Sequence, residues 1–389
     1  MPHRKSLLIQ VCSTFLFLIL TPWSFCQVLD GTPDTAKQQE PEADNSLTHY
    51  KQLKEEYRKK EKKINELYSN LNLGSQETRA EQFKEINALQ VELDRARVEM
   101  FEAALAAARE IDDLERAPMY EVMEYAKSSY GGSRHSIPFD PAKTIEICEV
   151  LRQRGVLESK LFQLEVNASL ASLNFENVRK RINDAAQKGA TLPQPFIDGV
   201  NAAEEKWTRE KKLRTEEKDL PTIRMETTQG DITFVLFEDE APEAVRNFVS
   251  LIDSEFYDGL DFFQVKRGQM VRSGCPQNDG NSVPAYSVAS EAENDNARHH
   301  FAGSLSMLTD TNKNSCCSQF IISQRPLPHL DNNFTVIGRV IEGMDVLDNI
   351  IQVTNSSIQR GESKPKIQLI EVLSRRSGTT YIPNKLDEN

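Results

Sequence analysis

The 389-residue chain contains only six cysteines, and it has no long purely basic tract. Its 47 lysines and arginines are outnumbered by 59 aspartates and glutamates, so we do not expect a nucleic-acid partner. Two of the cysteines, Cys12 and Cys26, lie in the N-terminal segment, and four more are too few for a disulfide scaffold in a chain of this size. The length allows two domains, or one domain with a long helical arm.

Residues 1–26 have the pattern of an export signal. A basic start is followed by an apolar run from about Leu7 to Leu20, and Ser24 and Cys26 are small residues at the −3 and −1 positions of a cleavage site. The alternative is an uncleaved anchor, since the run is near the lower limit for spanning a membrane. We therefore expect an exported protein of the periplasm or cell envelope, bound to the inner membrane only if the signal is uncleaved.

The next part of the chain is predicted to be helical. Residues 27–45 are polar and are interpreted as a disordered spacer. Residues 46–130 predict a long helical hairpin or coiled coil, because apolar residues recur at seven-residue spacing at Ile86, Leu93, Met100, Ala107 and Leu114. The two helices either fold back on each other, pair in a homodimer, or belong to a bundle within one domain.

Residues 131–218 predict a small helical bundle. Asp140 followed by Pro141 is a helix start, and the paired helices weakly resemble a single tetratricopeptide-type repeat. We expect Cys148 to lie in the core of this bundle.

The pattern changes to alternating apolar residues near residue 219. A hairpin turns at Gly230, several short strands follow, and two amphipathic helices lie between them. This pattern predicts a closed antiparallel β-barrel with two capping helices over residues 219–376, followed by a tail at 377–389. The predicted fold class is thus multidomain, with an all-α N-terminal part and a β-barrel C-terminal part.

Several motifs in this second part resemble one family, the cyclophilins, in its bacterial branch. They are "APEAVRNFVSLIDSEFYDGLDFFQV", "GSLSM", "SQFIIS", "PHLDNNFTVIGRVIEGMDVLDNI" and "IQLIEVL". The resemblance implies a peptidyl-prolyl cis-trans isomerase that needs no cofactor and acts on Xaa-Pro segments of unfolded or exported chains. Rotation about a prolyl bond meets a barrier of about 20 kcal/mol, so the site needs a donor that bonds the prolyl nitrogen in the twisted state.

At the two catalytic positions of the family, this sequence has the arginine and the glutamine in each other's place. In the family, an arginine in "FHR" is the donor and a glutamine in "MxQGG" touches it. Here Gln264 stands at the arginine position and Arg272 at the glutamine position. Our hypothesis is that the two have changed places and that both are catalytic, since arginine is long and rich in donors. The alternative is that the site has decayed and that Arg272 is a solvated charge.

Other positions match the substrate groove of the family. The resemblance implies peptide contacts at Phe262, Met270, Gln319, Phe320, Ile321, His329, Leu330 and Phe334. Ile321 replaces a phenylalanine that forms the floor of the proline pocket, which leaves an apolar but smaller floor. Cys275, Cys316 and Cys317 fall in loops that border this groove, so a disulfide from Cys275 to one of the others is one expectation, and reduced thiols are the other. No metal site is predicted.

Two functions follow from the resemblance. The first is a prolyl isomerase that assists the folding of exported proteins, with reduced activity because Gln264 stands at the arginine position. The second is a non-catalytic module that binds proline-containing peptides or serves as a scaffold in the cell envelope.

Overall fold

The structure is a computed structural model that describes residues 42–71, 76–111, 118–130, 139–280, 286–309, 315–360 and 363–386. The predicted signal and most of the predicted spacer lie outside these residues. Helix α1 (Glu42–Asn70) begins inside the range predicted as spacer, so its last four residues are helical. In the part of the chain that is described, no helix is long and apolar enough to cross a membrane.

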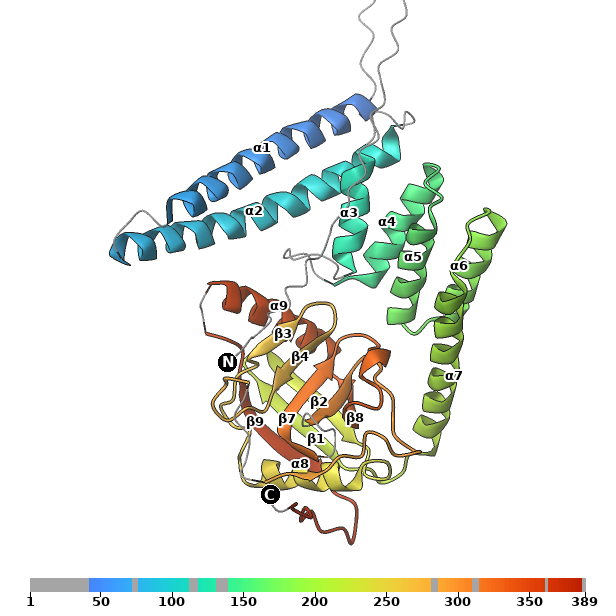
Figure 1. The fold of residues 1–389 in the computed structure, drawn as a ribbon, viewed down its shortest axis with the longest axis vertical. Helices are drawn as coiled ribbons and strands as arrows, with labels where there is room; N and C mark the ends of the chain where they lie inside the picture. Colours follow the sequence, from blue (N-terminus) through green and yellow to red (C-terminus); the bar gives the residue numbers. More distant parts are fainter. Residues whose placement is uncertain are drawn as a thin grey trace, which may run out of the picture. The chain divides into compact units, whose positions relative to one another are not determined.

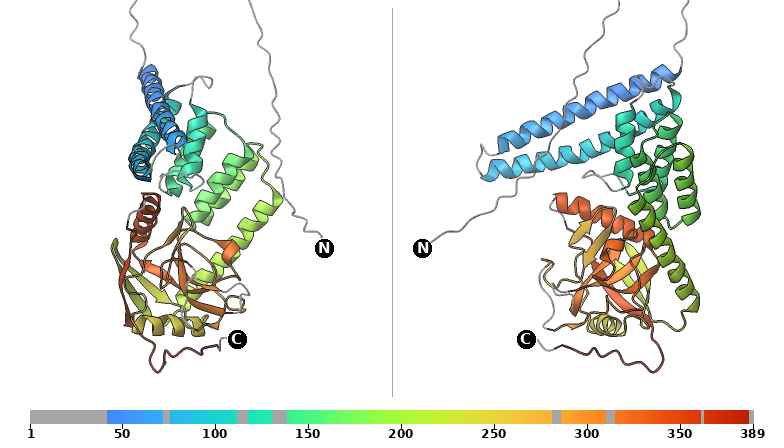
Figure 2. Two further views of the ribbon diagram at one scale, coloured as in Figure 1. Left: turned by 60° about the vertical axis from the view of Figure 1, so that its left-hand side comes forward. Right: turned by 45° about the vertical axis from the view of Figure 1, so that its right-hand side comes forward.

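Helices α1 and α2 (Gln76–Glu110) lie side by side as an antiparallel hairpin (Figures 1 and 2). Lys60 Nζ lies 2.8 Å from Glu92 Oε2, and Lys63 Nζ lies 3.2 Å from Glu85 Oε1. Leu114 of the predicted heptad seam lies outside the described residues. The other four residues of the seam are buried: Ile86, Leu93, Met100 and Ala107. Pairing within one chain accounts for their burial, and a coiled-coil dimer stays a prediction.

Five further helices complete the N-terminal region: α3 (Met119–Ser129), α4 (Pro141–Gln153), α5 (Ser159–Ala171), α6 (Phe175–Gln187) and α7 (Gln194–Glu216). Asp140 caps α4, because its side chain accepts a hydrogen bond of 2.8 Å from the Lys143 N–H. Asn174 caps α6 in the same way through the Asn177 N–H. Cys148 is fully buried in a core formed by residues of α1 to α5, which confirms that it is a core residue of the helical region.

The C-terminal region is a curled antiparallel sheet of nine strands among the described residues (Figure 1). Its order is β3-β4-β7-β6-β8-β2-β1-β9, with β5 paired to β7. The strands are β1 (Thr222–Thr227), β2 (Gly230–Leu236), β3 (Gln264–Lys266), β4 (Met270–Ser273), β5 (Val288–Ala289), β6 (Ser304–Thr309), β7 (Ser315–Ser323), β8 (Thr335–Glu342) and β9 (Ile367–Ser374).

The closed barrel predicted from the sequence is not confirmed. The strand order begins at β3 and ends at β9, and among the described residues these two end strands do not pair in a ladder. The segments around their starts meet through an isolated bridge between Asp261 and Lys366 and through a few backbone hydrogen bonds, such as that from the Phe262 N–H to the Pro365 carbonyl at 3.0 Å. Twist curls the sheet enough to bring its ends together, but the short β3 does not extend the ladder to β9. The fold is therefore a half-barrel.

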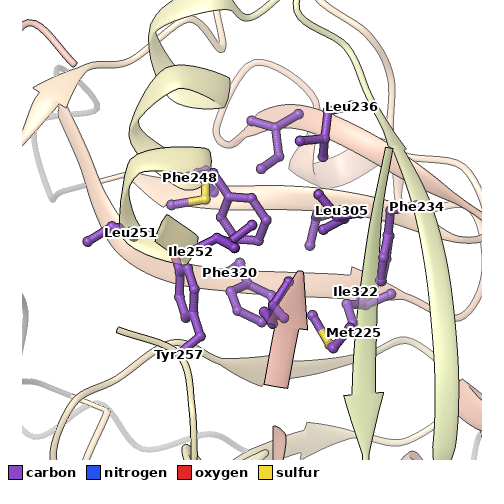
Figure 3. Close-up of a cluster of buried hydrophobic side chains, with 14 of the residues drawn as sticks. Met225, Phe234, Leu236, Phe248, Leu251, Ile252, Tyr257, Leu305, Phe320 and Ile322 are labelled. Carbon is purple, nitrogen blue, oxygen red and sulfur yellow. The ribbon is translucent and has the colours of Figure 1, made fainter. Parts of the chain in front are cut away.

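The core of the half-barrel lies inside the curl and is covered by α8 (Pro242–Asp253). In this core, three aromatic side chains lie close together: Phe248 of α8, Phe320 of β7, and Tyr257, which follows α8 (Figure 3). The Phe248 ring lies 5.0 Å from that of Tyr257 and 5.7 Å from that of Phe320. The second helix of this region, α9 (Met344–Arg360), follows β8 and contributes Leu347, Ile350 and Ile351 to the same core.

Helix α7 is joined to the sheet region through buried ion pairs. The guanidinium of Arg298 lies about 3 Å from carboxylate oxygens of Glu210 in α7, of Glu217 directly after α7, and of Glu240. Trp207 of α7 packs against Phe301 with ring centroids 5.0 Å apart. We call this set of contacts the α7 junction.

Candidate active site

The register of three neighbouring strands brings the predicted site residues to one face of the sheet. Gln264 of β3 lies opposite Arg272 of β4, and Arg272 in turn lies opposite Ile321 of β7. Residues directly opposite each other in an antiparallel pair point to the same face. We call this face the groove face. Met270 shares it, since it lies two residues from Arg272.

The guanidinium of Arg272 is held by neutral partners. Its Nη1 donates to Gln264 Oε1 at 3.2 Å, and its Nη2 donates to Gln319 Oε1 and, at 3.3 Å, to the Gly280 carbonyl. The Arg272 Cζ also lies 5.3 Å from the centroid of the Phe263 ring. These contacts keep the half-buried side chain over the groove face.

A glycine brings β4 and β7 close enough for this arrangement. Gly274 follows β4 with a φ of +84°, and a Cβ at this position would lie 2.3 Å from the Ser318 carbonyl oxygen. Only glycine fits such an approach without a shift of the backbone. The close packing places Gln319 beside Arg272, although the two residues are 47 positions apart.

Among the described residues, the charge of Arg272 is not balanced by a carboxylate. Within the described part of the chain, no carboxylate forms an ion pair with this residue. Burial lowers the pKa of Arg272 from its usual value, although arginine stays protonated at neutral pH. The site therefore presents a fixed, incompletely solvated cation that can donate hydrogen bonds to an electron-rich atom.

The other predicted peptide contacts are only partly accessible. Met270, Leu330 and Phe334 are half-buried, and His329 is exposed on the short helix η2 (Pro328–Leu330). Burial and the nearby charge of Lys266 lower the pKa of His329, so its ring is neutral at pH 7. Ile321 has no exposed surface, so a proline ring can contact it only after a neighbouring side chain moves.

Two residues expected in the groove lie in the core instead. Phe262 and Phe320 are fully buried among the core side chains of the half-barrel. The alternation of β7 explains this for Phe320, because its neighbours Gln319 and Ile321 point to the groove face. These two phenylalanines support the strands and are not placed to contact a peptide.

The cysteine candidates have other surroundings than a disulfide requires. The Cys275 thiol lies 3.0 Å from Asp279 Oδ1 and accepts a hydrogen bond from the Gly280 N–H at 3.1 Å. Cys316 lies in the core, and Cys317 is half-buried, so the disulfide stays a prediction. Among the described residues, no group of three or more potential ligands could hold a metal ion.

Two contacts of the site had not been anticipated from the sequence: the Phe263 ring and the Gly280 carbonyl. Alternation along a strand would place Phe263 and Gln264 on opposite faces, but β3 begins at Gln264, so the alternation does not extend to Phe263. Gly280 belongs to a loop, whose path no periodic pattern reveals. No sequence signal marks either contact.

Comparison with known proteins agrees with this geometry. The family described as "Cyclophilin type peptidyl-prolyl cis-trans isomerase/CLD" matches residues 222–372. A peptidyl-prolyl cis-trans isomerase of Helicobacter pylori is 38% identical over 130 residues, which cover 33% of this chain and 78% of the relative. This chain belongs to the cyclophilin-type peptidyl-prolyl cis-trans isomerases.

This chain is also similar to other cyclophilins. Peptidyl-prolyl cis-trans isomerase B of Bacillus subtilis is 40% identical over 119 residues, which cover 31% of this chain and 82% of the relative. A crystal structure of a cyclophilin-type isomerase from Cryptosporidium parvum is 25% identical, with a TM-score of 0.37, and covers 40% of this chain and 99% of that one. The cyclophilin match begins at β1, so helices α1–α7 precede it.

Proposed function

We propose that this cyclophilin isomerises Xaa-Pro bonds and that Arg272 performs the task that the family assigns to an arginine at the position of Gln264. The observation that carries the proposal is the bond between Arg272 Nη1 and Gln264 Oε1, at 3.2 Å. The pair is in contact on the groove face, as an exchange of the two residue types requires.

The chemistry needs a donor that binds the twisted amide better than either planar isomer. As the prolyl bond rotates, its nitrogen loses resonance and gains a localised lone pair. The Arg272 guanidinium has five N–H donors, three of which bond to Gln264, Gln319 and Gly280. Its charge attracts a lone pair more strongly in the twisted state than in the planar state, and this difference lowers the barrier.

The same geometry supports a reduced rate. The guanidinium approaches the groove from β4 instead of β3, and a displacement of about 1 Å in a catalytic group can cost roughly a hundredfold. The covered Ile321 adds a second cost, because a proline ring must displace a side chain to reach it.

The biological setting follows from the predicted signal at residues 1–26. Export would place the protein in the periplasm or cell envelope, where its substrates are Xaa-Pro segments of unfolded or exported polypeptides. A homodimer through the α1–α2 hairpin is part of the same proposal. Sequencing of the mature N-terminus would test export, with Gln27 as the expected first residue.

A second candidate is a groove that binds proline-containing peptides without catalysis. The three existing bonds of Arg272 favour it, since a guanidinium that already donates to Gln264, Gln319 and Gly280 is less available to the prolyl nitrogen.

Exchange spectroscopy by NMR on a short Xaa-Pro peptide separates the two functions. We expect the protein to accelerate cis-trans exchange and Arg272→Ala to reduce this acceleration by about a hundredfold. Arg224→Ala is the matched control, since Arg224 lies on β1 of the same sheet, paired with Glu226 and Glu371. Peptide binding without acceleration in the wild-type protein would support the binding module instead.

A further inference from the structure

A second cavity lies beside the groove. It has a volume of about 450 Å³ and is lined mainly by apolar side chains of α5, α6 and α7, together with the segment 325–329 of the cyclophilin region. Leu170, Phe175 and Phe196 form part of its helical wall. This volume is within the range of ligand-binding cavities, roughly 300–1,000 Å³.

The cavity shares one lining residue with the predicted peptide contacts. His329 lines the cavity, and it also stands at a predicted peptide contact on η2. The Lys206 ammonium of α7 lies 2.7 Å from Asp331 Oδ2, just after η2, and thereby ties the helical wall to the groove wall. A peptide that contacts His329 therefore lies at the edge of the cavity.

A strained residue forms another part of the wall. Leu173 follows α5 with a φ of +54°, and its N–H bonds to the Leu170 carbonyl at 3.0 Å, in the position where helices commonly end with glycine. A leucine in this conformation is strained. The strain is explained if the Leu173 side chain is needed in the cavity.

Arg325 is the charged residue among the polar lining residues of the cavity, which also include Asn167, Tyr130 and His329. Its guanidinium stacks over the Tyr130 ring, with Cζ 4.7 Å from the centroid, and both residues line the space. Apolar walls with one fork of N–H donors suit an extended polypeptide, whose side chains bury apolar area while its carbonyls accept hydrogen bonds.

We propose that this cavity binds an apolar segment of the same unfolded polypeptide whose Xaa-Pro bond occupies the groove. This inference rests on the proposed function for the location of the Xaa-Pro bond. The helical region then selects substrates by the apolar residues near the proline, in addition to the proline itself.

Two substitutions alter the cavity in opposite ways. Gly199→Leu on α7 places a side chain in the cavity, since a Cβ at Gly199 would meet no atom within 4 Å, and leucine favours a helix more than glycine. Leu173→Gly removes part of the wall and relieves the strained backbone. Neither variant is expected to lower the melting temperature. Ala202→Leu adds the same side chain at an exposed position of α7 and serves as the control.

The test compares two peptides of equal length that contain one Xaa-Pro bond. One carries a block of leucine and phenylalanine beside the proline, and the other a block of serine and glycine. We expect the wild-type protein to bind the apolar peptide at least about tenfold more tightly, as measured by calorimetry. Gly199→Leu and Leu173→Gly should both lose this preference, and Ala202→Leu should keep it.

Equal affinity of the wild-type protein for both peptides, or a preference that survives in both cavity variants, would overturn the proposal. A change of oligomeric state in Gly199→Leu without a change in peptide affinity, measured by sedimentation velocity, would also overturn it and identify a second copy as the occupant. Isomerisation of a short Xaa-Pro peptide is measured in parallel. Its absence, with the apolar preference intact, would refute the proposed function but support the cavity.

Discussion

The α7 junction and the groove each contain an arginine beside the same sheet. The partners of one arginine are charged carboxylates, and the partners of the other are neutral. At the junction, Arg298 is 2% exposed in its side chain and contacts the carboxylates of Glu210, Glu217 and Glu240. In the groove, Arg272 is bonded to two side-chain amides and a carbonyl.

The pKa values of the two arginines shift in opposite directions as a result. Burial lowers the pKa of both, but the carboxylates around Arg298 outweigh it and raise the pKa of that residue above its usual value. The pKa of Arg272 stays lowered, since amides stabilise a cation less than carboxylates do. Arg298, whose charge is neutralised by carboxylates, therefore holds α7 against the sheet. Arg272, whose charge is not neutralised by a carboxylate, can interact with a substrate.

The largest expected effect is on stability at the α7 junction. Arg298→Ala leaves Glu240 buried without a cation, while Glu210 keeps Arg214 and Glu217 keeps Arg339, so we expect a loss of about 3–5 kcal/mol in the free energy of unfolding. Urea denaturation at pH 7 measures it. Burial raises the pKa of Glu240, so this carboxyl can take up a proton when the pH falls. The loss of unfolding free energy in Arg298→Ala should therefore become smaller as the pH falls toward about 5. A loss below about 1 kcal/mol would show that the junction does not depend on Arg298.

A smaller effect is expected at Asp331, which links α7 to the groove wall. Burial raises the pKa of this carboxyl, but hydrogen bonds from His299, His300 and Lys206 outweigh it and hold the pKa well below its usual range. A lowered folded-state pKa contributes stability that is present above the unfolded pKa near 4 and is lost as the pH falls below it. The stability difference between pH 6 and pH 3 should therefore shrink by about 1–2 kcal/mol in Asp331→Asn.

Thermal unfolding across this pH range measures the Asp331 effect. Asp295→Asn, at an exposed position, is the control. Identical acid dependence in both variants would contradict the role of Asp331.

The smallest effect on stability is expected in the groove itself. Arg272→Ala exposes amides and a carbonyl that water can solvate, so the free energy of unfolding should change by less than about 1 kcal/mol. Urea denaturation beside Arg298→Ala gives the direct contrast. A comparable loss in both variants would mean that Arg272 is a structural arginine, like Arg298.

Much of the cyclophilin region could be predicted from the sequence, because its signals are local. The Gly230 hairpin appears in β1 and β2, and the pairing of Gln264 with Arg272 was anticipated from motifs on adjacent strands. The helix cap at Asp140 was equally visible, since a cap and its helix are consecutive in the chain.

The rest depends on contacts between residues that are far apart. Arg298 and Glu210 are separated by 88 positions, and neither has a sequence context that indicates the other. The cavity combines three helices with the segment 325–329, so no single pattern contains it. The burial of Phe262 was missed because a motif match reveals the residue type and not the side of the sheet to which the residue points.

The measurement that tests the exchange most directly is a double-mutant cycle of isomerase activity at positions 264 and 272. The four proteins are the wild type, Gln264→Arg, Arg272→Gln, and the double variant that restores the order of the family. We predict that Arg272→Gln loses about a hundredfold in kcat/KM because it leaves no arginine in the groove, and that adding Gln264→Arg recovers or exceeds the wild-type value. Wild-type activity in Arg272→Gln alone would contradict the account, since the groove would then work without either arginine.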